Sequence, residues 1–277
     1  MPLARGASRS LAPEVVEDHA RLLVERGHPE EVLTGVDLGH YGADLVPGTS
    51  LAALLARLAR IPGLRWLRLS SMLPAYFTED VLQVVAASPV VAPHFHVPLQ
   101  SGGDRVLRAM RRPYTAAMYR RVVERLAAAT PRLGLGADVI AGFPGETEDD
   151  FAATLGLVEA LPFSYLHVFP YSPRQGTSAA RLPRIGADAA AARARRLRDL
   201  AADKRRRFNA AMLGREEDVL VLQMRDRTSG GLVGLTGNYV EVVFPGPDRL
   251  RRGVARLRVA AVEGDAILGA LVETPAT

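Results

Sequence analysis

The hydrophobic positions of this chain alternate between the spacing of a helix and the short unbroken runs of a buried strand. Helical spacing predicts helices over 13–25, 51–59, 114–129 and 148–161, and Thr78 is placed to cap a further one. Strand-like runs occupy 31–36, 66–71, 94–98, 136–142 and 165–169. Alternating strands and helices predict an α/β fold with a parallel sheet, either an open doubly wound sheet or a barrel. No G-x-G-x-x-G follows the first strand, which disfavours a dinucleotide-binding fold.

The pattern changes near Gly214. A long helix is predicted over 187–213 and interpreted as a linker. Beyond it, five short apolar runs broken by glycines predict a small β-barrel of the oligonucleotide-binding kind. The sequence therefore predicts two domains, 1–213 and 214–277.

Composition narrows the function classes. The 277 residues include no cysteine, which excludes disulfides, cysteine nucleophiles, thiolate zinc sites and thiolate-held iron–sulfur clusters within this chain. No stretch approaches the roughly 20 uncharged apolar residues of a membrane span, and the first ten residues do not form a secretory signal. A soluble, cytoplasmic protein without a membrane partner is expected.

Positive charge is concentrated in two blocks. The net charge is +5, and Lys204 is the only lysine. Residues 105–132 include eight arginines and one acidic residue, and residues 181–207 include ten basic residues and three acidic ones. Such blocks favour a polyanion partner, although solvated helix faces in an arginine-rich chain give the same pattern. The candidate RNA-binding residues are Arg108, Arg111, Arg112, Arg225, Arg249, Arg251 and Arg252.

Three histidines offer a possible metal site. His94 and His96 would lie on one face of a strand, and His167 lies on a later strand. No clear carboxylate ligand completes the set in the sequence. Core or hydrogen-bonded histidines are therefore the favoured interpretation, and a metal-dependent hydrolase is an alternative function.

Six motifs occur in an order that resembles the radical S-adenosylmethionine (SAM) methylthiotransferases. They are Leu-Thr-Gly-Val-Asp-Leu-Gly-His-Tyr-Gly (33–42), Leu-Ser-Ser (69–71), His-Phe-His-Val-Pro-Leu-Gln-Ser-Gly (94–102), Met-Arg-Arg-Pro-Tyr-Thr (110–115), Asp-Val-Ile-Ala-Gly-Phe-Pro-Gly-Glu-Thr (138–147) and His-Val-Phe-Pro-Tyr-Ser-Pro-Arg (167–174). Within the family, they are most similar to the threonylcarbamoyladenosine-specific branch.

The resemblance implies a partial (β/α) barrel followed by a small RNA-binding TRAM barrel over 214–277. It implies that SAM lies across the strand ends, with Gly35, Gln100, Ser101, Asp138 and Gly142 as candidate lining residues. It also implies methylthiolation at C2 of N6-threonylcarbamoyladenosine at position 37 of tRNA. The implied partners are tRNA and an electron donor, and not DNA. Individual catalytic roles do not follow from the resemblance.

One departure from the family pattern is large. Family members hold a 4Fe-4S cluster with C-x-x-x-C-x-x-C, and a stretch just after it resembles this chain's start at Pro2, Ala4, Arg5, Gly6, Arg9 and Ser10. We expect this chain to be an incomplete copy that lacks the cluster loop and the first barrel strand, either because its start codon is assigned too late or because it is a fragment. A non-catalytic tRNA-binding remnant is the alternative.

Overall fold

The computed structural model describes residues 6–174 and 176–272, so Pro2, Ala4 and Arg5 of the expected post-cluster stretch lie outside the described residues. The chain divides into two units, which are described separately. Unit 1 comprises 6–72, 76–94 and 209–272, and unit 2 comprises 73–75 and 95–208. Across the described residues, no helix combines the length and the apolar character needed to span a bilayer.

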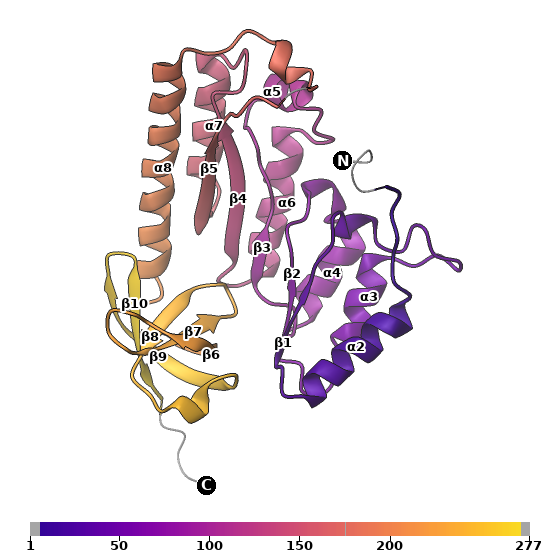
Figure 1. Ribbon diagram of the computed structural model, residues 1–277, viewed down its shortest axis with the longest axis vertical. Helices are drawn as coiled ribbons and strands as arrows, with labels where there is room; N and C mark the ends of the chain where they lie inside the picture. Colours follow the sequence, from indigo (N-terminus) through magenta and orange to yellow (C-terminus); the bar gives the residue numbers. More distant parts are fainter. Residues whose placement is uncertain (1–5, 175, 273–277) are drawn as a thin grey trace. The chain divides into compact units, whose positions relative to one another are not determined.

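The first part of unit 1 is a two-stranded parallel sheet with helices (Figure 1). Its elements are helix α2 (Pro13–Glu25), strand β1 (Glu30–Leu33), helix α3 (Leu51–Leu58), strand β2 (Trp66–Leu69) and helix α4 (Glu79–Ala87). A short 3-10 turn lies at Leu38–His40, and a second one, Pro74–Tyr76, includes residues assigned to unit 2. All four residues of β2 are buried, and they include the charged Arg68 beside three apolar residues. Thr78 accepts a hydrogen bond from Val81 N and caps α4 as predicted.

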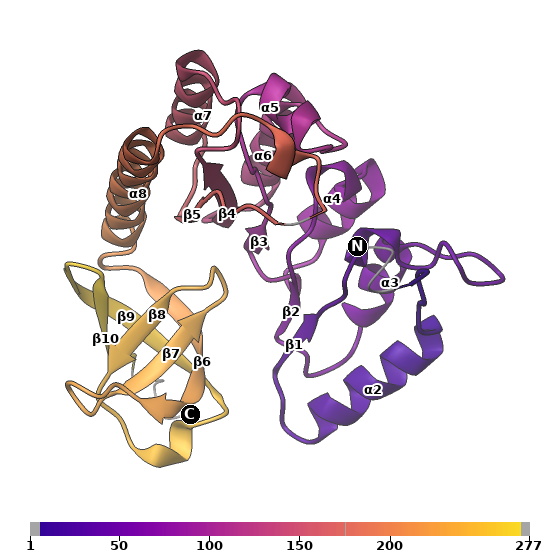
Figure 2. The same ribbon diagram turned by 45° about the horizontal axis from the view of Figure 1, so that its top comes forward.

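Unit 2 is built on a three-stranded parallel sheet in the order β3-β4-β5. The strands are β3 (His94–His96), β4 (Gly134–Ala141) and β5 (Tyr165–Pro170), and the helices are α5 (Asp104–Ala109), α6 (Ala116–Ala129), α7 (Glu148–Ala160) and α8 (Ala187–Ala210). A 3-10 turn covers Ala179–Arg181. Alternate residues of β4, from Leu135 to Ala141, are fully buried, and helices α6 and α7 cover one face of the sheet in both ribbon views (Figures 1 and 2).

Helix α8 contributes to the packing of unit 2. Leu197 is fully buried, and Lys204 Nζ donates to the carbonyls of Glu159 (2.9 Å) and Leu161 (2.7 Å) at the end of α7. Arg193 reaches the buried carboxylate of Glu146 at 2.8 Å. The segment interpreted as a linker is therefore a packed helix, and two of its basic residues, Arg193 and Lys204, make contacts inside unit 2.

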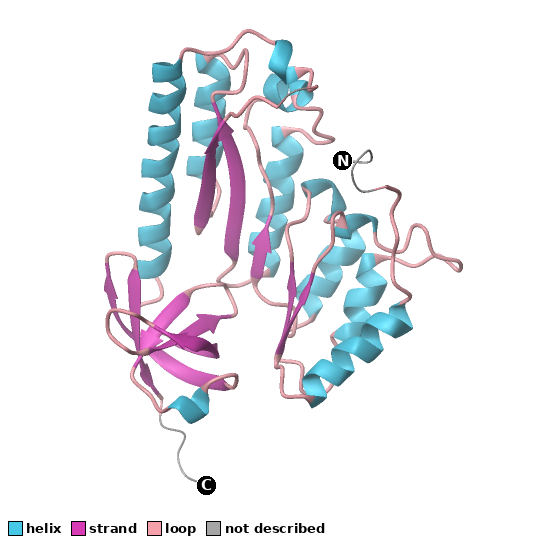
Figure 3. Cartoon of the chain, in the orientation of Figure 1, coloured by secondary structure: helices cyan, strands magenta, loops and turns pink. Residues whose placement is uncertain are grey.

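The C-terminal part of unit 1 is a closed five-stranded barrel in the order β10-β8-β7-β6-β9 (Figure 3). Its strands are β6 (Glu216–Arg225), β7 (Leu232–Thr236), β8 (Glu241–Phe244), β9 (Val254–Glu263) and β10 (Ala266–Leu271), with a 3-10 turn at Asp248–Leu250. Alternation along β9 buries Ala255, Leu257 and Val259 in the barrel core. The five predicted short strands are confirmed, and closure leaves no open sheet edge.

Candidate functional site

Gln100 marks the carboxyl edge of the unit 2 sheet. Its N–H donates to the carbonyl of Asp138 (2.8 Å), and its own carbonyl accepts from Ile140 N (2.9 Å), which places it beside the last residues of β4. Gln100 is buried and has φ 66°, a left-handed conformation that residues with a side chain adopt rarely. Strained backbone of this kind is typical of ligand-contact positions.

Ser101 faces the protein interior. It is fully buried, and its Oγ lies 3.3 Å from Thr154 Oγ1 on α7 and accepts from Gly103 N at 3.1 Å. The backbone also approaches α7 closely here, because a Cβ on Gly102 would lie 2.6 Å from Thr154 Cα. Ser101 therefore holds the loop that carries Gln100 against α7.

Gly142 begins the turn that leads from β4 into α7. Its φ is +77°, and its N–H donates to Glu146 Oε2 at 3.2 Å. Burial raises the pKa of Glu146, and hydrogen bonds from Arg193 and from Gly142 N oppose that rise. The Tyr171 ring lies edge-on to Phe143 at 5.4 Å, and its buried hydroxyl has no hydrogen-bond partner among the described residues. This edge thus presents a polar group that a bound ligand could pair.

Replacement of Gly142 by alanine is expected to destabilise unit 2. A side chain at this φ costs about 1–2 kcal/mol, and the added Cβ would also lie 2.7 Å from Ala190 Cβ. Gly145→Ala is the matched control, because Gly145 has φ +76° but an added Cβ would meet nothing within 4 Å. Chemical unfolding should show a larger loss for Gly142→Ala. Equal losses would mean that contact with α8 contributes nothing.

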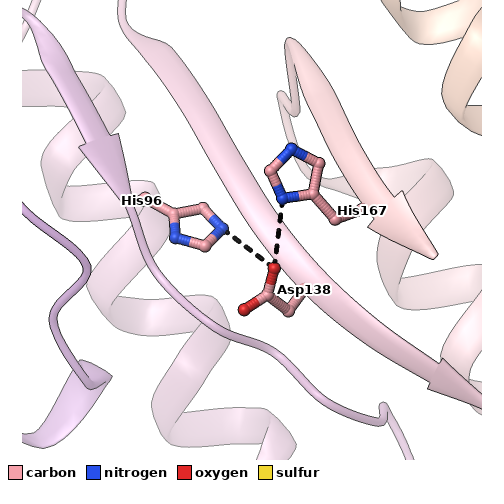
Figure 4. A group of neighbouring side chains, drawn as sticks. All are labelled: His96, Asp138 and His167. Atoms are coloured by element: carbon pink, nitrogen blue, oxygen red, sulfur yellow. Dashed lines mark hydrogen bonds and ion pairs between the residues drawn. The ribbon is translucent and has the colours of Figure 1, made fainter. Parts of the chain in front are cut away.

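His96, Asp138 and His167 come together on one face of the sheet (Figure 4). Asp138 and His167 are register partners on β4 and β5. Asp138 Oδ1 lies 3.3 Å from His96 Nε2 and 3.3 Å from His167 Nδ1. Burial raises the pKa of Asp138, but hydrogen bonds and charge from the two histidines outweigh it, and the net pKa is lowered. The two histidines therefore favour the ionised form of the Asp138 carboxylate.

An aromatic ring flanks this cluster. Tyr165 is nearly parallel to the His96 ring, with a 9° interplanar angle and 6.1 Å between centroids. Gly136 makes room for it, since a Cβ there would lie 2.0 Å from Tyr165 Cζ. His94 is not part of the cluster and instead stacks on Tyr239 in unit 1 at 4.4 Å. His94 is buried, as expected for a core histidine. The sequence offered no clear carboxylate beside the histidines, and in the structure Asp138 occupies that position.

In unit 1 the ends of β1 and β2 carry Gly35 and Ser70. Ser70 N donates to Leu33 O (2.9 Å), which joins the two strand ends, and the Ser70 Oγ is buried without a hydrogen-bond partner among the described residues. Gly35 has open space, since a Cβ there would meet Leu38 only at 3.8 Å. Gly35 belongs to unit 1, whereas the other four candidate SAM-lining residues belong to unit 2.

The predicted RNA-binding arginines fall into two groups. Arg108, Arg111 and Arg112 lie at and after the end of α5 in unit 2, and the first two are exposed. In the unit 1 barrel, Arg225 and Arg251 bind Asp248, at 2.6 Å and 3.1 Å, and Arg225 also donates to two loop carbonyls. Arg225 and Arg251 therefore organise the loop between β8 and β9. Arg249 and Arg252 are exposed.

Comparison with known proteins identifies the family. The model of the radical SAM superfamily matches residues 2–158, which is more than half of the chain. The chain belongs to the radical SAM superfamily. A tRNA-2-methylthio-N(6)-dimethylallyladenosine synthase from Cereibacter sphaeroides is 39% identical over 97% of this radical SAM chain. The threonylcarbamoyladenosine tRNA methylthiotransferase MtaB of Aquifex aeolicus is 38% identical over 87% of it.

This radical SAM chain spans 61% of the length of the first relative and 57% of the second. Among solved structures, coproporphyrinogen III oxidase (HemN) from Escherichia coli matches with a TM-score of 0.52 and 13% identity, covering 89% of this chain and 59% of that one. At that identity the likeness concerns the fold. It agrees with the predicted α/β radical SAM core.

The residues of this radical SAM chain fit one of the family's two cofactors and not the other. Superfamily members use SAM and a 4Fe-4S cluster. The strand-edge residues fit SAM, because Gln100 and Gly142 bring backbone to the edge and the Tyr171 hydroxyl lacks a hydrogen-bond partner among the described residues. The chain does not fit the cluster, because it has no cysteine to supply thiolate ligands.

The sequence pattern did not indicate that Asp138 lies beside the histidines or that Arg225 holds the barrel loop. Asp138 is separated from His96 and His167 by whole helices, so the only signal was the predicted parallel order of their three strands. For Arg225 the pattern offered no signal, because Asp248 lies on a loop outside the predicted strands.

Proposed function

We propose that this chain supplies the SAM-binding and tRNA-binding parts of a tRNA methylthiotransferase. The single observation that carries the proposal is the similarity of almost the whole chain, both core and C-terminal barrel, to tRNA methylthiotransferases at 35–39% identity. The fold and the strand-edge residues support it. As part of the proposal, the enzyme acts in the cytoplasm, where tRNA is modified, and takes electrons from an electron donor.

SAM is proposed to bind at the strand edge. In unit 2, Gln100 and Gly142 bring backbone to the ligand, and Asp138 acts through its carbonyl, which accepts from Gln100 N. Gly35 of unit 1 is a candidate from the family resemblance alone. Ser101 positions Gln100 by holding its loop on α7. When bound, SAM supplies the methyl group and the precursor of the radical. The chain's residues bind and orient it, and no residue is assigned a step that involves the cluster.

The C-terminal barrel, residues 214–277, is proposed to be a TRAM domain that binds RNA. Its closed five-stranded form supports this, because small barrels of this type bind oligonucleotides on their strands and loops. Arg249 and Arg252 would contact phosphates directly, whereas Arg225 and Arg251 would hold the loop that carries them. The group Arg108, Arg111 and Arg112 would provide further phosphate contacts from unit 2.

The proposed substrate is threonylcarbamoyladenosine at position 37 of tRNA. Relatives named for this nucleoside and for dimethylallyladenosine are similarly close to the chain. The ordered motifs, including His-Val-Phe-Pro-Tyr-Ser at 167–172, favour the threonylcarbamoyl branch. Competition between otherwise identical tRNAs tests this choice. The threonylcarbamoylated tRNA should compete several-fold better than the dimethylallylated one, and the reverse order would overturn it.

The double variant Arg249→Ala/Arg252→Ala is expected to weaken tRNA binding several-fold. Each phosphate contact releases counterions from the RNA, so the loss of a contact reduces the number released on binding. The magnitude of the slope of log affinity against log salt should therefore decrease by about 0.7–0.9 per arginine. Filter-binding titrations at three salt concentrations measure both quantities. Folding should be nearly unaffected, because both side chains are exposed and neither is paired with Asp248.

The matched control is Arg256→Ala/Arg258→Ala. These two barrel arginines are also exposed, but they pair with Glu216 on the neighbouring strand. Their charge is already partly neutralised, so the salt slope should change less. If both double variants bind tRNA like the unmodified chain, the barrel is not part of the RNA site and the RNA-binding role of residues 214–277 is wrong.

A further inference from the structure

Three donor atoms converge on the face of the unit 2 sheet opposite helices α6 and α7. His96 comes from β3, Asp138 from β4 and His167 from β5, so neighbouring parallel strands contribute one residue each. Figure 4 shows the two imidazoles on either side of one carboxylate, both directed at its Oδ1 atom. The three ligand atoms all lie within 4.8 Å of one another. The sheet register holds this arrangement in place, since Asp138 and His167 are direct partners.

The spacing of these atoms matches that of ligands around one cation. Both nitrogen–oxygen distances are 3.3 Å, longer than the roughly 2.7–2.9 Å of a good charge-assisted hydrogen bond. With metal–ligand bonds of about 2.1 Å, two donors 3.3 Å apart subtend about 104° at the metal, close to tetrahedral. A small movement of the rings would bring all three atoms into coordination.

The donor chemistry selects the class of cation. Two imidazole nitrogens and one carboxylate oxygen suit first-row divalent metals such as Zn²⁺, Fe²⁺ and Co²⁺ more than Ca²⁺ or Mg²⁺, which prefer oxygen ligands. A two-histidine, one-carboxylate set leaves coordination positions open for water or a ligand. His167 is half-exposed, so a cation can enter from solvent. The parallel Tyr165 ring restrains the His96 plane, as neighbouring residues orient metal ligands.

We propose that His96, Asp138 and His167 form a site for one first-row divalent transition-metal ion, distinct from the family's iron–sulfur cluster. The site uses only residues of unit 2 and does not depend on the proposed tRNA substrate. The Asp138 carboxylate supplies the charge, and the histidines supply the selectivity over alkaline-earth cations. Its open positions make it a candidate second binding point for an oxygen or nitrogen atom of a substrate.

Titration calorimetry of the purified chain with Zn²⁺ tests the site, with Co²⁺ absorption as a spectroscopic second readout. One Zn²⁺ per chain is expected, and Co²⁺ should give visible ligand-field bands. Asp138→Asn and His167→Asn should each weaken Zn²⁺ binding at least about tenfold, because even outer-shell changes cost 10–100-fold in metal affinity. Mg²⁺ should not compete at equal concentration.

His40→Ala is the matched control. His40 also pairs with an aspartate, at 2.8 Å from Asp37, but on an exposed turn of unit 1. Its removal should leave the Zn²⁺ affinity unchanged. The proposal is overturned if no stoichiometric binding occurs, if the Asp138 and His167 variants bind like the parent, or if His40→Ala weakens binding equally. Because the His167 ring is more than half exposed, its variant should fold, as circular dichroism can verify, even if Asp138→Asn does not.

Discussion

Anaerobic reconstitution of the 277-residue chain with iron and sulfide is expected to produce no 4Fe-4S cluster. Clusters in this superfamily are held by cysteine thiolates, and the chain contains no cysteine. Histidine replaces cysteine in some iron–sulfur proteins, but only alongside cysteines that hold the remaining iron. We therefore expect the 4Fe-4S cluster to be completely absent. Iron and acid-labile sulfide analysis, together with visible charge-transfer absorbance, measures it after desalting.

Iron without sulfide is a separate expected outcome of the same experiment. A mononuclear Fe²⁺ at His96, Asp138 and His167 would remain with the chain, carry no acid-labile sulfide and disappear in Asp138→Asn. That variant is thus the control that separates histidine-bound iron from a cluster. Stoichiometric iron and sulfide with strong visible absorbance would contradict the prediction and would require ligands other than thiolates.

Removal of the Glu30 carboxylate is expected to destabilise unit 1 by about 3–5 kcal/mol. Glu30 on β1 and Arg68 on β2 form a buried ion pair, with side chains 6% and 3% exposed. The pair is bidentate, with Arg68 Nε and Nη2 donating to the two Glu30 carboxylate oxygens at 2.8 Å and 3.1 Å. Glu30→Ala would leave a buried guanidinium without its counter-charge. Urea unfolding of the variant and the parent measures the loss in the free energy of unfolding.

The control is Glu216→Ala, which breaks an exposed glutamate–arginine pair on β6. Glu216 lies 2.7 Å from Arg258, whose side chain is 62% exposed, and such solvent-screened pairs contribute little to stability. The double variant Glu30→Leu/Arg68→Met should recover most of the loss, because it removes both charges at once. If Glu30→Ala cost no more than Glu216→Ala, burial of this pair would have no energetic consequence.

Arg68 also joins the barrel to the strands of unit 1. Its Nη1 donates to Gly237 O at 2.9 Å in the turn between β7 and β8, and its guanidinium lies over the Tyr239 ring at 5.0 Å. A Cβ on Gly237 would lie 3.0 Å from Trp66 Nε1, so the turn and β2 approach closely. Arg68 therefore contacts both Glu30 on β1 and the barrel turn.

Local signals predicted most of the elements. Thr115 and Thr147 each accept a hydrogen bond at the start of a helix whose beginning the sequence indicated, and Thr147 completes a capping box with Asp150. Strand ends shifted by a few residues, as at β1, which ends at Leu33. Helix α5 was not predicted, because its six residues are too few to display a helical period.

The sequence by itself determined the order of helices and strands, the five-stranded C-terminal barrel, the family motifs and the absence of thiolate ligands. These properties depend on neighbouring residues or on composition. Only the tertiary structure decided which polar residues meet. Asp138 lies between His96 and His167, and Arg68 pairs with Glu30, because parallel strands bring distant segments side by side in one register. Residues 38 positions apart, as in that ion pair, leave no periodic trace along the chain. Burial makes the loss of one partner of such a pair costly in free energy of unfolding, and burial depends on how the whole molecule packs.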